Sequence, residues 1–149
     1  MGNLDNLLKE FTSTVVPFVK NECKANLIVT CGQCWGGNAS FKAGAMNSDD
    51  IRGIVSLHGA KINEADCNAL KKPVYYVQTD GDFDKDTAEG IIGKKVDIGK
   101  LCKFEKSTQA HGFTSSGGKY KDENWVKTYI EPVVVNIVAF CESVFADSK

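Results

Sequence analysis

The chain has 149 residues, of which 42% are hydrophobic and 25% are charged, and its formal net charge is −1. This length and composition are typical of one soluble domain with a hydrophobic core, and the near-neutral charge argues against a nucleic-acid or anionic-membrane partner. The longest apolar run, Val133 to Cys141, is interrupted by Asn136 and is too short to span a bilayer. We therefore expect a single domain over residues 1–149, with no nucleic-acid and no membrane partner.

Strand-like and helix-like segments alternate along the chain. The predicted helices cover residues 4–18, 38–46, 64–70, 87–92 and 122–145, and the predicted strands cover residues 27–30, 54–58, 74–78 and 101–106. Asn63 is a suitable N-cap for the third helix, and Pro132 is expected to kink or restart the last one. This alternation predicts an α/β fold, with a short parallel sheet of about four strands and helices on both faces.

A cysteine stands where the first predicted strand passes into a helix. Residues 27–37 read Leu-Ile-Val-Thr-Cys-Gly-Gln-Cys-Trp-Gly-Gly, an apolar run that ends in a Gly-x-Cys-x-Gly-Gly turn. This is the pattern of a nucleophile elbow, which holds a reactive side chain above a parallel sheet. The thiol of Cys34 would be the nucleophile, and Gly32 and Gly36 would leave room where strand and helix converge.

Candidate partners for this thiol follow later strands. A cysteine nucleophile needs a base, and the base needs a group that orients it. His111 lies in a loop before the last helix, and Asp82 follows the third predicted strand. Both positions fall at the carboxyl ends of strands, where active sites of parallel sheets form. The chain order Cys34, Asp82, His111 is the nucleophile–acid–histidine order of α/β-hydrolases.

Three motifs in this order and spacing resemble the dienelactone hydrolase family: Gly-x-Cys-x-Gly-Gly, Pro73 followed nine residues later by Asp82, and His111-Gly112-Phe113. The resemblance implies an α/β-hydrolase that cleaves a small-molecule ester or lactone with a Cys-Asp-His triad and needs no metal or organic cofactor. Cys34 would attack the carbonyl, His111 would transfer the proton, and Asp82 would orient His111. The backbone N–H of Trp35 would stabilise the oxyanion, and His58 and Phe113 would line the substrate site.

The resemblance covers only the latter part of the family domain, so the early strands and the loop that supplies a second oxyanion N–H have no counterpart before Leu4. One edge of the strand at Leu27–Thr30 would then be unpaired, and such edges favour association. We expect a homodimer, or another chain, to cover this edge. Ser115 and Ser116 stand where the family often has an arginine, which argues against a dienelactone-like acid as the substrate.

Other interpretations remain open. Cys31 and Cys34 form a C-x-x-C motif, as in thioredoxin-like thiol-disulfide oxidoreductases, and a disulfide between them could also switch a hydrolase off. A third possibility is a degenerate, non-catalytic relative that acts through protein interaction. The N-terminus has no signal-like segment, so we expect a cytoplasmic protein with reduced cysteines. Cysteines 23, 67, 102 and 141 have no nearby histidines, which argues against a zinc site among them.

Overall fold

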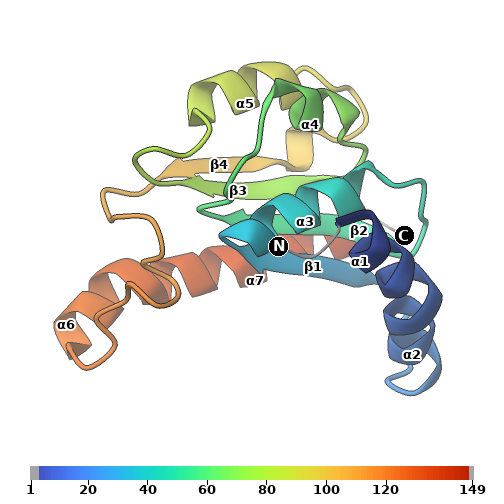
Figure 1. Cartoon of the computed structure of the whole chain (residues 1–149), viewed down its shortest axis with the longest axis horizontal. Coiled ribbons are helices and arrows are strands. Elements are labelled where there is room, and N and C mark those ends of the chain that lie inside the picture. The colour runs from blue at the N-terminus through green and yellow to red at the C-terminus, as the bar shows by residue number, and fades with distance from the viewer. Residues whose placement is uncertain (1–3, 148–149) are drawn as a thin grey trace.

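Four parallel strands form one sheet at the centre of the molecule (Figure 1). In the computed structural model, which describes residues 4–147, the strands lie in the order β1-β2-β3-β4. Their bounds are β1 (Ile28–Gln33), β2 (Ile51–Leu57), β3 (Val74–Gln78) and β4 (Lys103–Lys106). The sequence therefore predicted the fold class correctly, and the third strand has the predicted bounds.

Helices connect the strands and flank the sheet. Two helical runs lie at the ends of the chain: α1 (Leu4–Glu10), η1 (Phe11–Val15) and α2 (Val16–Asn21) precede β1, and α6 (Glu123–Trp125), η3 (Val126–Ile130) and α7 (Glu131–Ala146) follow β4. The others are α3 (Trp35–Ala45), α4 (Glu64–Ala69), α5 (Lys85–Ile92) and the short η2 (Gly99–Leu101). Asn63 caps α4 as predicted, because its side chain accepts two first-turn N–H groups.

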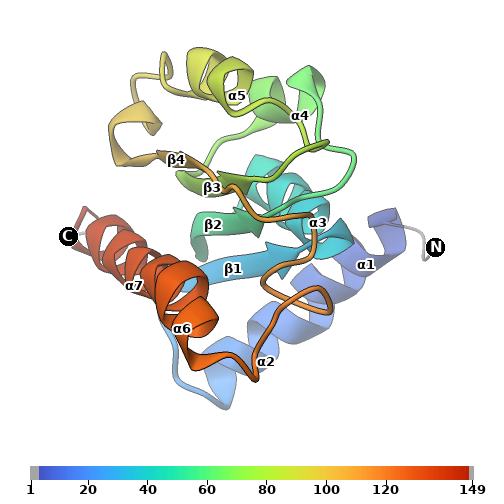
Figure 2. The same ribbon diagram turned by 90° about the vertical axis from the view of Figure 1, so that its left-hand side faces the viewer.

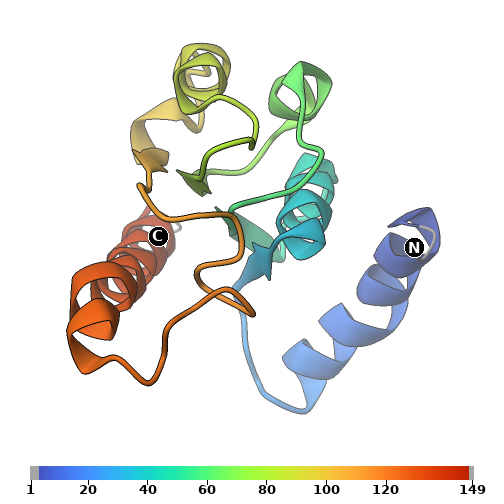
Figure 3. The same ribbon diagram turned by 60° about the vertical axis from the view of Figure 1, so that its left-hand side comes forward.

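The sheet separates two hydrophobic cores. Alternate residues of β2 and β3 point to opposite faces, so Ile54 and Tyr76 belong to one core and Val55 and Tyr75 to the other. The first core is closed by α3, α4 and α5, and the second by α7, as Figures 2 and 3 show from two directions. The predicted arrangement with helices on both faces is confirmed.

The first strand is longer than its sequence pattern indicates. The predicted strand ended at Thr30, whereas β1 continues through Cys31 to Gln33 and pairs with β2 along this extension. The helix α3 then begins at Trp35, several residues before its predicted start. The turn between strand and helix is thus reduced to Cys34 alone, which makes the elbow tighter than expected.

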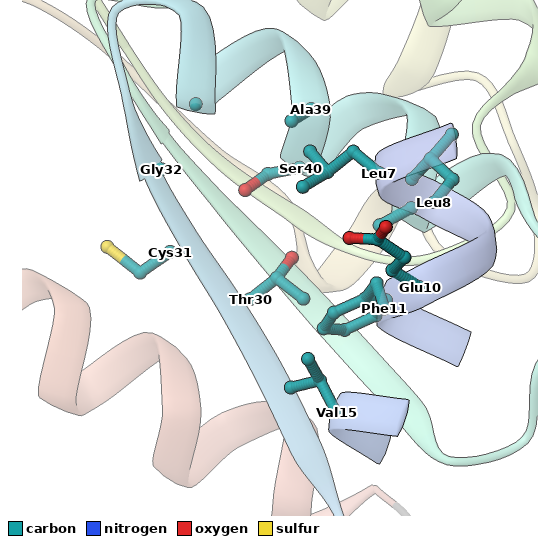
Figure 4. Close-up of a pocket in the computed structure, with 12 residues that line it drawn as sticks. Leu7, Leu8, Glu10, Phe11, Val15, Thr30, Cys31, Gly32, Ala39 and Ser40 are labelled. Carbon is teal, nitrogen blue, oxygen red and sulfur yellow. The ribbon is translucent and has the colours of Figure 1, made fainter. Parts of the chain in front are cut away.

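The other side of β1 is an edge of the sheet, as predicted, since β1 pairs only with β2 among the described residues. A pocket of about 270 Å³ lies along it, between the N-terminal helical run and the start of α3 (Figure 4). Leu7, Leu8 and Phe11 line it from the helical side. Thr30 faces it from β1, and the hydroxyl of Thr30 is buried without a hydrogen-bond partner in the described structure.

The C-terminal helical run is longer than the apolar stretch seen in the sequence. Residues Glu123–Ala146 form a continuous run of 24 residues that is long and apolar enough, by length and composition only, to cross a membrane. The core helix of a soluble protein passes the same test but is mostly buried, whereas 17% of the apolar window of this run is buried. Here Val133, Phe140 and Val144 of this run are buried against the sheet.

Candidate active site

Cys34 occupies a strained backbone position between β1 and α3. Its φ of 52° and ψ of −120° lie in a region that non-glycine residues rarely adopt. Such strain at a strand–helix junction is the mark of a nucleophile elbow. A Cβ atom added to Gly32 would lie 1.9 Å from the carbonyl oxygen of Gly36, so Gly32 permits the close approach that the sequence predicted.

The prediction for Gly36 was wrong, because a Cβ atom there would meet nothing within 4 Å. The residue that must lack a side chain is Gly37, whose added Cβ would lie 2.7 Å from the Cα of Gly59. The helix α3 therefore packs on the loop after β2 through Gly37, one position later than the motif suggests. The contact brings the two loops that carry Cys34 and His58 together.

His111 and Asp82 form the predicted pair. Nδ1 of His111 lies 2.8 Å from Oδ1 of Asp82, and the carboxylate can only accept, so Nδ1 carries the proton and Nε2 presents a lone pair. The other oxygen of Asp82 accepts the N–H of Thr79 at 2.8 Å and also the Thr79 hydroxyl. The Asp82 side chain is 4% exposed and that of His111 is 41% exposed, so a buried carboxylate holds an accessible imidazole.

A second histidine faces the thiol directly. His58 is fully buried, and its Nδ1 accepts the backbone N–H of Cys34 at 3.2 Å and lies 3.4 Å from Sγ of Cys34. Because Nδ1 accepts, the proton lies on Nε2, which donates to the hydroxyl of Thr114 at 2.6 Å. Burial lowers the pKa of His58, and the nearby His111 lowers it further. The neutral imidazole therefore presents its Nδ1 lone pair to the thiol.

These groups come from three separate loops and meet at one end of the sheet. One donor atom each from Cys34, His58 and His111 lies within 4.8 Å of the other two. The two imidazole rings meet edge to face, with 4.9 Å between their centroids. The structure thus brings the predicted nucleophile, base and acid together and adds His58, which the sequence placed only as a pocket-lining or structural residue.

The other predicted site residues have different surroundings. Trp35 begins α3, so its backbone N–H is in the first turn, where N–H groups have no acceptor within the helix. Phe113 is 2% exposed and packs edge to face on His58 with 5.9 Å between centroids. It therefore supports the His58 ring and does not form an open wall for substrate.

The structure removes the basis of the thioredoxin-like alternative. In a redox C-x-x-C motif both cysteines adjoin the start of a helix. Here Cys31 lies inside β1, opposite Val55, and only Cys34 adjoins α3. Figure 4 shows the Cys31 side chain directed away from Thr30. Both cysteines are free thiols.

The sequence did not reveal several contacts around Cys34, His58 and Asp82. Thr79 fixes Asp82, Thr114 fixes His58, and the Ser115 hydroxyl lies 3.9 Å from Sγ of Cys34. These hydroxyl residues occur in loops, and their positions carry no periodic or motif signal. Only the proximity of Thr114 and Ser115 to His111 along the chain could have suggested a role at the site.

Comparison with known proteins agrees with this geometry. The model of the dienelactone hydrolase family matches residues 5–133 of the chain. The chain belongs to the dienelactone hydrolase family. It is also similar to a human protein named carboxymethylenebutenolidase homolog, with 29% identity over an alignment of 109 positions that covers 68% of this chain and 42% of the relative. The chain thus spans less than half the length of this curated relative.

Membership of the dienelactone hydrolase family agrees with the parallel sheet and with the strand–elbow–helix unit around Cys34. The matched residues include every strand and the loops that carry Cys34, His58, Asp82 and His111. The site is therefore built from the part of the chain that the family shares.

Proposed function

We propose that this chain is a hydrolase of small-molecule esters or lactones that uses Cys34 as nucleophile, His111 as general base and acid, and Asp82 as the residue that orients His111. The observation that carries the proposal is the pairing of His111 Nδ1 with Asp82 at 2.8 Å beside a strained cysteine elbow. This pairing leaves Nε2 of His111 as the basic nitrogen on the side of the thiol.

The reaction would proceed in two stages. His111 takes the thiol proton as Sγ of Cys34 bonds to the acyl carbon, and the N–H of Trp35 stabilises the negative oxygen. The C–O bond then breaks, and the alcohol leaves with the proton from His111. Water next gives a proton to His111 and bonds to the acyl carbon, the C–S bond breaks, and the acid and the free thiol are regenerated.

His58 would hold the resting thiol in this scheme. Nδ1 of His58 lies 3.4 Å from Sγ and can accept the S–H group, which holds the thiol in place until a substrate is present. A small rotation of the Cys34 side chain would then move the thiol from its contact with His58 to one with His111. Catalytic hydrogen bonds are often long in the absence of substrate and shorten only in the complex.

Turnover of p-nitrophenyl acetate tests the proposal. The reduced wild type should release nitrophenol, whereas Cys34→Ala and His111→Ala should not, and mass spectrometry should find an acetyl group on Cys34. The control is Cys141→Ser, which removes a thiol of α7 outside the site. A fully reduced wild type that neither turns over nor becomes acetylated would support the non-catalytic alternative, in which the chain acts through protein interaction.

We also propose that the free edge of β1 pairs with the same edge of a second copy of the chain. A two-fold axis would place the two β1 strands antiparallel and join the two sheets into one. Support comes from the unpaired edge, from the exposed Val15 at the pocket, and from the exposed Phe18 of α2. Light scattering at about 100 µM, a range that detects weak interfaces, should find a dimer, and a strict monomer would contradict it.

The reduced state of Cys34 on which this chemistry depends fits a reducing compartment, and we propose the cytoplasm as the place of action. Fractionation of cells that express the chain with a small tag would locate it. Recovery in a membrane or secreted fraction would contradict the proposal.

A further inference from the structure

We propose that Cys34, His58 and His111 form a binding site for Zn²⁺ that reversibly blocks the thiol. The donor set is one sulfur and two imidazole nitrogens, which is a combination that zinc prefers in proteins. The observation that carries the proposal is the placement of these three donors within 4.8 Å of one another. The site does not depend on the proposed hydrolysis, because binding needs only the donors.

The spacing of the first two donors already fits a bound ion. A tetrahedral zinc with a sulfur at 2.3 Å and a nitrogen at about 2.0–2.1 Å holds the two atoms about 3.5–3.6 Å apart. Sγ of Cys34 and Nδ1 of His58 are 3.4 Å apart in the absence of metal. The His111 donor lies within 4.8 Å of both atoms, and its side chain is 41% exposed, so a small approach to the ion completes the set.

Each histidine is already oriented as metal-binding histidines are. Such residues usually donate their outer N–H to a carboxylate or another oxygen, which fixes the ring and leaves the inner nitrogen for the metal. His111 donates from Nδ1 to Asp82, and His58 donates from Nε2 to Thr114. The nitrogens that remain, Nε2 of His111 and Nδ1 of His58, are those that would ligate.

Coordination leaves no buried backbone group without a partner. The N–H of Cys34, which His58 accepts, is also within hydrogen-bond reach of the Leu57 carbonyl oxygen at 3.2 Å, so it keeps that partner when zinc takes the imidazole lone pair. The thiol releases its proton to water as the Zn–S bond forms. With three protein ligands, the fourth position is open to water, as in catalytic zinc sites.

Cobalt(II) titration of the reduced chain tests the site, because a thiolate ligand produces a sulfur-to-cobalt charge-transfer band. The wild type should show this band, zinc should abolish it by competition, and a chelator should restore the metal-free spectrum. Cys34→Ser should lose the band. Cys31→Ser, which changes a cysteine of β1 only three residues away, should keep it. Circular dichroism of each variant verifies the fold.

Calorimetry with zinc alone then tests the histidines. Asp82→Asn, which alters only the group that orients His111, should weaken zinc affinity by about 10- to 100-fold. His111→Gln, on an exposed loop, should weaken it further, and His58→Gln should do the same where it folds. The proposal is overturned if the wild type shows no charge-transfer band, if the band survives Cys34→Ser, or if His111→Gln binds zinc as tightly as the wild type. None of these readouts requires a substrate, so failure of the hydrolase proposal would leave the result unchanged.

Discussion

Nδ1 of His58 accepts the backbone N–H of Cys34 at 3.2 Å and thereby ties the end of β2 to the elbow that follows β1. Both residues have a positive φ, 41° for His58 and 52° for Cys34. The hydrogen bond therefore joins two strained backbone positions at the carboxyl end of the sheet. The hydrogen bond requires a neutral imidazole, because a protonated Nδ1 would donate and could not accept. This tie between β2 and the elbow therefore requires an uncharged His58.

This requirement predicts a loss of stability in acid. Burial lowers the pKa of His58 from its ordinary value of 6.5, so below about pH 6.5 the unfolded chain takes up a proton at this residue while the folded chain does not. The free energy of unfolding should thus fall as the pH decreases from 6.5 toward the folded pKa. Urea denaturation at several pH values measures it. In His58→Gln the free energy of unfolding should depend less on pH over this range. An unchanged pH dependence would mean that another group causes the effect.

Loss of the charge on Asp82 should impair catalysis without unfolding the chain. Asp82→Asn removes the carboxylate that holds the proton on Nδ1 of His111, so the ring can adopt the wrong tautomer. We expect kcat/KM for an ester to fall by about 10²- to 10⁴-fold, the range that general acid–base catalysis contributes.

The matched control is Asp80→Asn in the same loop. Asp80 is 85% exposed and pairs with the exposed Lys106 at 3.6 Å, so the same chemical change there should leave kcat/KM within a factor of about two. Equal losses of kcat/KM in the two variants would mean that activity depends on the charge of the loop as a whole and that Asp82 does not act specifically on His111.

The cysteines should differ in reactivity according to burial. Burial raises the pKa of Cys67 and of Cys102 to about 11, from an ordinary value of 9.0. Near pH 8 their thiolate fraction is then about 100-fold lower than in an unfolded chain. Iodoacetamide labelling followed by peptide mass spectrometry should find both residues at least 100-fold slower to react in the folded protein than in urea. The exposed Cys23 should react at about the same rate in both states and serves as the internal control.

The sequence predicted the order of elements because local patterns report burial directly. The strand Val74–Gln78 is fully buried, and its apolar run after Pro73 gave both bounds. Asn63 was recognised as a cap because side-chain capping depends on residues only two or three positions away. The proximity of Cys34, Asp82 and His111 was predicted for a related reason, since the carboxyl ends of parallel strands lie on one edge of the sheet.

The features that the sequence did not reveal depend on distant parts of the chain. The segment Cys31–Gln33 has no alternating pattern and becomes strand only because it pairs with Val55–Leu57. Position 37 must be glycine because an added Cβ atom would clash with the Cα of Gly59, which belongs to another loop. His58 likewise gains its place beside Cys34 from a backbone turn with positive φ that no local pattern indicates.

Gly32 should be among the least tolerant positions of the chain. A Cβ atom there would lie 1.9 Å from the Gly36 carbonyl oxygen, and neither backbone can move away without opening the elbow. Gly32→Ala should lower the free energy of unfolding by about 1–3 kcal/mol, the usual range for overpacking. Gly90→Ala is the control, because Gly90 lies inside α5 with nothing within 4 Å of an added Cβ, and alanine should stabilise that helix by about 0.5–1 kcal/mol. Urea denaturation of both variants distinguishes a steric requirement at the elbow from a general effect of replacing glycine, which would give shifts of the same sign.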